Sequence, residues 1–92
     1  MAESEEFDTA CAYRLHPSVA LRPEPFGALA YHFGNRRLTL LKSRRLVEVL
    51  RALGSHGSAR AALEAAGVPE ASRATYERAL ASLLESEVID AR

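Results

Sequence analysis

The sequence predicts an α+β domain in which a three-stranded antiparallel sheet comes first and three helices follow. Two observations indicate this order. Turn-forming residues divide the stretch from Pro17 to Lys42 into three short extended runs, and a Gly-Asn pair between the last two is typical of a tight hairpin. From Ser43 onward, apolar residues recur at helical spacing between residues that favour helix ends.

The expected strands cover residues 19–22, 27–33 and 36–41. If Gly34 and Asn35 form the whole hairpin loop, Tyr31 lies opposite Leu38, and Leu29 lies opposite Leu40. Alternation along the strands then predicts one face in the core and one face near water. The predicted core face carries Leu29, Tyr31, Phe33, Leu38 and Leu40, and the predicted solvent face carries Ala28, Ala30, His32, Arg37 and Thr39.

The first helix is expected over residues 44–53, with Ser43 as its N-cap and Gly54 in the left-handed position after its end. An alanine-rich helix between Ser58 and Gly67 is too short to be stable unless it is packed. The longest helix begins at Pro69, and Val88 with Ile89 is expected to pack back on the core. Its apolar stripe consists of Tyr76, Ala79, Leu80, Leu83 and Leu84.

A chain of 92 residues with 48% hydrophobic content fits one globular domain, expected over residues 13–92. Residues 1–12 form an acidic segment that is expected to be disordered. The apolar runs are far shorter than the ~20 residues of a membrane helix, and the start lacks the features of a secretory signal. We therefore expect a cytoplasmic protein with no membrane partner.

Candidate catalytic and metal-ligating residues are few. The single cysteine, Cys11, excludes an internal disulfide framework. The three histidines His16, His32 and His56 fall in separate elements without the spacing of metal ligands. We therefore expect no catalytic residues, no metal site and no cofactor.

The formal net charge is zero, but residues 36–51 contain six basic residues and one acid, which gives this segment a local charge of +5. The charged residues are Arg36, Arg37, Lys42, Arg44, Arg45, Arg51 and the acid Glu48. Such a segment attracts an anionic partner. From the residues alone, a solvated face or an acidic N-terminus folded back on this segment explains the same pattern.

A family resemblance rests on two runs, HPSVALRPEPFGALAYHFGNRRLTLLKS and the helical RLVEVLRALGSHGSARAALEAAGV behind it. Over residues 13–89 the chain resembles the peptide chaperones of mycofactocin biosynthesis, which are PqqD-like proteins. It departs from the broader PqqD-like pattern at SEVID, where a small or glycine residue is usually followed by a bulky apolar one.

The resemblance implies a winged-helix-like PqqD-type fold, known as a RiPP recognition element. It also implies a non-catalytic chaperone that binds the leader of a short, acidic, ribosomally made precursor peptide. The chaperone would present that peptide to a radical SAM enzyme, the maturase, in mycofactocin biosynthesis.

In the family that this chain resembles, the leader adds as a strand to the third strand and lies in a groove beside the third helix, a mode known as β-augmentation. The implied peptide-binding residues are Arg36, Arg37, Leu38, Thr39, Leu40, Leu41, Lys42, Arg73, Tyr76, Leu80 and Leu83. Among them we expect Arg36, Arg37 and Arg73 to steer the acidic leader. The pairing edge is expected at Thr39, Leu40 and Leu41, whereas the positions on the third helix also fit a core role.

Two other classes remain open on the residues: a winged-helix regulator that binds nucleic acid, and a small scaffold or oligomerisation module. The helix that begins at Pro69 is a poor recognition helix, because its acidic side chains would be repelled by phosphate. These acids are Glu70, Glu77, Glu85 and Glu87, against Arg73 and Arg78. We expect either a monomer or a weak homodimer.

Overall fold

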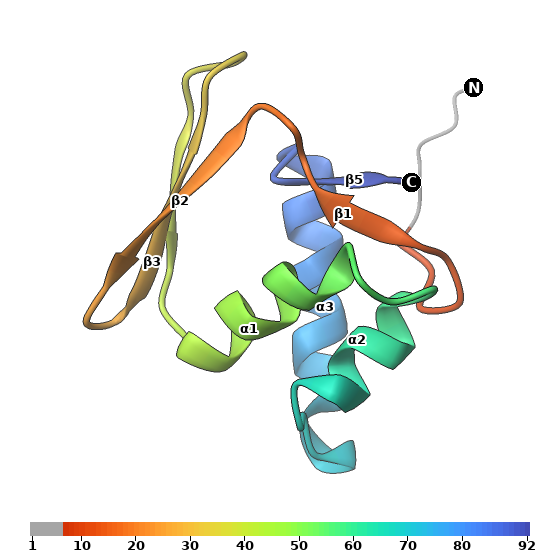
Figure 1. Ribbon diagram of the computed structural model, residues 1–92. Helices are drawn as coiled ribbons and strands as arrows, with labels where there is room; N and C mark the ends of the chain where they lie inside the picture. Colours follow the sequence, from red (N-terminus) through yellow and green to blue (C-terminus); the bar gives the residue numbers. More distant parts are fainter. Residues whose placement is uncertain (1–6) are drawn as a thin grey trace.

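The computed structural model describes residues 7–92, so the first six residues of the acidic segment lie outside the described part. The described residues form two small sheets and three α-helices (Figure 1). The strands are β1 Tyr13–Leu15, β2 Val19–Glu24, β3 Gly27–His32, β4 Leu38–Leu41 and β5 Ile89–Ala91. The helices are α1 Arg44–Leu53, α2 Ala59–Ala65 and α3 Arg73–Glu85, with a 3-10 turn at Glu70–Ser72. The predicted α+β class, with a three-stranded antiparallel sheet before three helices, is confirmed.

The helix boundaries follow from their caps. The Ser43 hydroxyl accepts the Leu46 N–H at 3.1 Å, and the Ser58 hydroxyl accepts the Ala61 N–H at 3.1 Å, so α1 and α2 begin where the sequence predicts. Gly54 has a right-handed backbone with φ of −71°, so its predicted left-handed position is wrong. The left-handed glycine is Gly67, with φ of 75°, which turns the chain after α2.

β1 pairs with β5, a pairing that was not predicted from the sequence. These strands are antiparallel, and Leu15 lies opposite Ile89. Val88 and Ile89 are buried, which confirms that they pack back on the core. The chain before β1 also has defined contacts, because the Cys11 carbonyl accepts the Ala59 N–H at 2.9 Å and Phe7 stacks on Tyr13. Residues 7–12 therefore contact the domain, and the rest of the segment that was expected to be disordered lies outside the described residues.

The three-stranded sheet, here called the main sheet, has the order β2-β3-β4. Tyr31 pairs with Leu38 and Leu29 with Leu40, as predicted. The hairpin loop is longer than two residues, however. The Arg36 N–H donates to the His32 carbonyl at 2.8 Å, and Arg36 has a positive φ of 64°, so Asn35 and Gly34 are only the middle of the turn.

The predicted facing of the main sheet is wrong. Ala28, Ala30 and His32 are buried against the helices, whereas Leu38 and Leu40 are 56% and 52% exposed. The cause is that α1 packs against β3, and small side chains on β3 allow this close approach. Phe33 is also exposed. The face that was predicted to lie near water is therefore the inner face, the one that packs against the helices. Arg37, its charged residue, is exposed, as predicted.

The core lies between the inner face of the main sheet, the three helices and the β1–β5 pair. Its largest fully buried side chains are Leu50, Leu53, Leu63, Leu80, Ile89 and Val49. Within residues 7–92, no helix combines the length and the apolar character that crossing a membrane requires.

Candidate functional site

The free edge of the main sheet is β4, because the strand order leaves β4 with one neighbour. The direction of its backbone groups follows from two hydrogen bonds. The His32 N–H donates to the Arg37 carbonyl on the β4 side at 2.9 Å, and the Phe33 N–H donates to the Ser18 carbonyl on the β2 side at 2.7 Å. Antiparallel pairing alternates residue by residue. In this register the backbone groups of Thr39 and Leu41 form hydrogen bonds with β3. Those of the alternate residues point away from β3, toward solvent.

The outward N–H and C=O groups of β4 therefore belong to Leu38 and Leu40. The sequence expected the pairing edge at Thr39, Leu40 and Leu41. The structure retains Leu40 in that role and turns the backbone groups of Thr39 and Leu41 toward β3. The pairing register is the predicted one, but the turn closes with hydrogen bonds at His32 and not at Phe33, so the hydrogen-bonded pairs are Ala30–Thr39 and Ala28–Leu41.

The opposite edge of the main sheet is interrupted by a proline. The same alternation, applied to β2, points the backbone of Pro23 away from β3, since Pro23 lies opposite Ala28. Proline has no N–H, so this position offers no donor to an added strand. An extended peptide thus meets an interrupted edge at β2 and an uninterrupted one at β4.

A hollow of about 180 Å³ opens between the start of α1 and the first turns of α3. It is lined by Ser43, Leu46, Thr75, Tyr76 and Ala79. The hydroxyls of Tyr76 and Ser43 lie 3.5 Å apart across it. Because Ser43 follows β4 after one residue, the hollow lies beside the end of the free edge.

The predicted site residues on α3 divide into two groups. Tyr76 is partly buried and lines the hollow, so it is accessible to a ligand. Leu80 is fully buried and Leu83 is 6% exposed, so both belong to the core and neither presents a contact surface. Sequence periodicity could not separate these roles, because all three residues share one helical stripe.

The basic side chains surround the edge at both ends. Arg36 and Arg37 are exposed in the β3–β4 turn, and Lys42 is exposed where β4 ends. Arg44 and Arg45 donate to the carbonyls of Pro25 and Gly67. Within residues 7–92, no base between positions 36 and 51 forms an ion pair with a carboxylate.

Arg73 lies apart from the basic residues of the β3–β4 turn. It starts α3 and donates to the Val68 carbonyl at 3.0 Å. In Figure 1 this end of α3, in cyan, is remote from the β3–β4 turn at the top of the main sheet. Arg36 and Arg37 therefore form one group at the β3–β4 turn, whereas Arg73 lies at the end of α3 that is remote from this turn.

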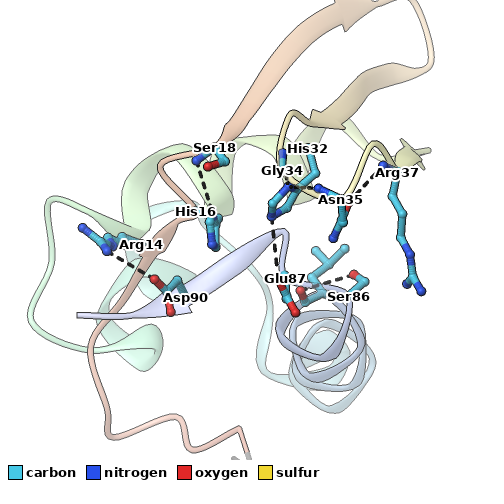
Figure 2. Close-up of polar contacts among 11 residues, drawn as sticks. Arg14, His16, Ser18, His32, Gly34, Asn35, Arg37, Ser86, Glu87 and Asp90 are labelled. Atoms are coloured by element: carbon cyan, nitrogen blue, oxygen red, sulfur yellow. Dashed lines mark hydrogen bonds and ion pairs between the residues drawn. The ribbon is translucent and has the colours of Figure 1, made fainter.

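A cluster that the sequence did not predict joins His16, His32 and Glu87 (Figure 2). The two imidazole ring centres are 4.5 Å apart, and the His32 Nε2 lies 3.9 Å from the Glu87 Oε1. His32 is 5% exposed, and its Nε2 has no hydrogen-bond partner within the described residues. The three residues come from distant parts of the sequence, so no short motif could have predicted the cluster.

The hydrogen bonds of this cluster do not fit a metal centre. His32 Nδ1 accepts the N–H groups of Gly34 at 3.0 Å and Asn35 at 3.2 Å, and His16 Nδ1 accepts the Ser18 N–H at 3.0 Å. A neutral ring that accepts at Nδ1 carries its proton on Nε2, whereas a ring that binds a metal through Nε2 carries it on Nδ1. We therefore interpret the cluster as a structural anchor for the β3–β4 turn.

Comparisons with known proteins show the family of this chain. The model of the peptide chaperone MftB family matches residues 12–90. The peptide chaperone MftB of Mycolicibacterium smegmatis is 51% identical over 89 residues, which cover 97% of this chain and 87% of that protein. The peptide chaperone MftB of Mycobacterium tuberculosis is 46% identical over 88 residues, covering 96% of this chain and 81% of that protein. None of the solved structures matches the chain.

These matches place the chain in the class of peptide chaperones, a class whose name implies a non-catalytic role. Within that class it belongs to the MftB peptide chaperone family. The family resemblance expected from the sequence is confirmed.

Proposed function

We propose that this protein is a non-catalytic chaperone of mycofactocin biosynthesis. It binds the leader of a short acidic precursor peptide as an added strand on β4 and presents the peptide to a radical SAM maturase in the cytoplasm. In this proposal the main sheet and the helices form a PqqD-type, winged-helix-like domain. The observation that carries it is an uninterrupted strand edge beside a hollow, in a chain whose other edge is interrupted by Pro23.

The free edge supplies part of the affinity. Leu38 and Leu40 offer four outward backbone groups. Four hydrogen bonds at ~0.5 to 1.5 kcal/mol each contribute roughly 2 to 6 kcal/mol. A micromolar dissociation constant corresponds to about 8 kcal/mol, so side chains must supply the difference.

Apolar leader side chains that enter the hollow supply the rest of the binding free energy in this proposal. In an added strand, residues directly opposite Thr39 and Leu41 share their face and point toward the helices. Two leader side chains spaced by two residues therefore face the hollow that Leu46 and Tyr76 line. Each apolar side chain that becomes fully buried there adds roughly 1.5 to 3 kcal/mol. The proposed leader thus carries apolar residues at alternate positions.

Charge orients the leader. Arg36 and Arg37 at one end of β4 and Lys42 at the other lie close to the path of an added strand. Acidic leader residues outside the paired segment would meet these bases, and this attraction raises the rate of encounter. Arg73 would act on a different part of the peptide, beyond the end of the groove.

A titration of the ¹⁵N-labelled domain with a synthetic acidic leader peptide tests the proposal. We expect the amides of Leu38 and Leu40 to gain protection from hydrogen exchange, whereas those of Thr39 and Leu41 are protected already in the free protein. Shifts are also expected around Tyr76. The absence of any change at peptide concentrations of about 100 micromolar, where a micromolar binder is saturated, would contradict the proposal.

A further inference from the structure

The outer face of the main sheet carries a continuous set of apolar side chains, here called the outer patch. It consists of Leu29, Tyr31, Phe33, Leu38 and Leu40. Phe33, Leu38 and Leu40 are 62%, 56% and 52% exposed. The ring of Phe33 packs edge-on against that of Tyr31 with centres 5.0 Å apart, so the turn and the strands form one surface.

The outer patch has no role in the core. All three helices lie on the other face of the main sheet, where Ala28, Ala30 and Leu41 are buried (Figure 1). On β2 the solvent face of the main sheet carries charged residues, Arg22 and Glu24. The same face of β3 and β4 could carry small or polar residues in the same way. Instead the largest side chains of the hairpin face water. A contiguous exposed apolar surface of this kind marks an interaction site.

We infer that the outer patch is the surface by which this chaperone docks on its maturase. The inference rests on the proposed function, which requires the peptide-loaded chaperone to bind an enzyme. The partner surface that fits is apolar in its centre and acidic at its border, because Arg36, Arg37 and Lys42 stand at the two ends of β4.

The charge of this region argues against a second copy as the occupant. Two outer patches brought face to face would also bring together two sets of the basic residues at the ends of β4, Arg36, Arg37 and Lys42. Like charges at an interface oppose association and act against such a pair. An enzyme surface bordered by Asp and Glu side chains meets the opposite condition.

The width of the outer patch argues against the leader as the occupant. Neighbouring strands are about 4.8 Å apart, so a leader paired with β4 lies about 10 Å from the line of β3. Tyr31 and Leu29 are on β3, and Phe33 extends beyond it into the turn. One extended peptide at the edge leaves these three side chains uncovered, whereas a folded protein surface spans them.

In this arrangement β4 serves two partners through different atoms. The backbone groups of Leu38 and Leu40 face the leader at the edge, and their side chains face the maturase. A bound leader would add its own outward side chains to the outer patch. The maturase therefore contacts the chaperone and the leader on one surface and binds the loaded chaperone more tightly than the free one.

The test uses the double variant Tyr31→Thr/Phe33→Thr, because both residues lie away from the leader edge and threonine retains strand propensity. Binding of the purified maturase and binding of a fluorescent leader peptide are measured separately. We expect the affinity for the maturase to fall at least about tenfold and the affinity for the leader to change less than about threefold. The control is Phe26→Thr, an aromatic residue with 42% exposure in the β2–β3 turn at the other end of β3.

Each outcome decides the inference. Unchanged maturase binding by the double variant, or loss of the leader with the maturase retained, overturns it. If the wild-type protein binds both partners and the double variant keeps the maturase, the inference alone fails. If the wild-type protein binds the leader but never the maturase, or does not bind the leader, the proposed function fails as well. Concentration-dependent dimers that the double variant abolishes would assign the outer patch to a second copy. Phe33→Thr alone, at the most exposed side chain of the outer patch, provides a second variant if the double variant does not fold.

Discussion

Replacement of Leu40 by proline tests strand addition at a single backbone group. Leu40 points its N–H away from β3, so proline at this position removes a donor from the free edge and leaves the pairing with β3 intact. The main sheet already accommodates a proline of this kind at Pro23, on the outward side of β2. We therefore expect the Leu40→Pro variant to fold.

The size of the effect follows from the outward groups. Proline removes the Leu40 donor, and its ring hinders approach to the Leu40 carbonyl, so up to two of the four expected hydrogen bonds are lost. At ~0.5 to 1.5 kcal/mol each, the loss is about 1 to 3 kcal/mol. This corresponds to a dissociation constant for the leader that rises about 5- to 150-fold.

The assay is fluorescence anisotropy with a labelled leader peptide, with thermal unfolding as a check of the fold. Leu40→Ala is the matched control, because it shortens the same half-exposed side chain and retains the N–H. Strand addition requires a clearly greater loss for proline than for alanine. Wild-type leader affinity in a folded Leu40→Pro variant would refute pairing at this edge.

Three further predictions concern charge, a glycine and a histidine. Arg37→Glu with Lys42→Glu should weaken binding of an acidic leader several-fold in low salt, and the loss should shrink as the salt concentration rises. Gly27→Ala should lower the free energy of unfolding by more than ~2 kcal/mol in urea titrations, because its φ is 151° and a Cβ would overlap the Leu41 carbonyl oxygen. His32→Phe should lower the free energy of unfolding by about 1 to 3 kcal/mol, because two turn N–H groups lose their acceptor.

Each of these variants has a control or a contrary result. Arg78→Glu reverses an exposed charge on α3 outside the basic segment and should leave leader binding nearly unchanged; an equal loss there would make the effect one of net charge alone. Gly57→Ala meets no atom within 4 Å and should be close to neutral. Unchanged stability of His32→Phe would show that water replaces the imidazole as the acceptor.

Local patterns in the sequence predicted the elements and their order. Capping serines located the starts of α1 and α2, and the hairpin signal identified the pairing of Tyr31 with Leu38. These features depend on residues close in sequence. The edge position of β4 followed from the meander order, and it is confirmed as well.

The facing of the main sheet could not be predicted from hydrophobicity. The inner face needed small residues, Ala28 and Ala30, to admit α1, and it carries a polar residue, His32, whose Nδ1 accepts two N–H groups of the turn. Ranking by hydrophobicity places leucines inside, so it inverted the sheet. The apolar residues that were predicted to lie in the core are the residues of the outer patch.

Long-range pairings were also beyond the sequence. β1 and β5 have three residues each, too few for a periodic signal, and they come from opposite ends of the chain. The approach of His16 and His32 to Glu87 depends on how the elements assemble. Such contacts come from the tertiary fold rather than from local preference.

The proline in β2 limits the stoichiometry of any assembly through strand edges. If two copies paired β4 with β4, the combined sheet would end at Pro23 on both sides. Pro23 offers no donor there to a third copy, so growth beyond two copies and into fibres is disfavoured. The same pairing would use the groups that a leader needs, so a leader and a second copy would compete, and excess peptide would return the protein to single copies.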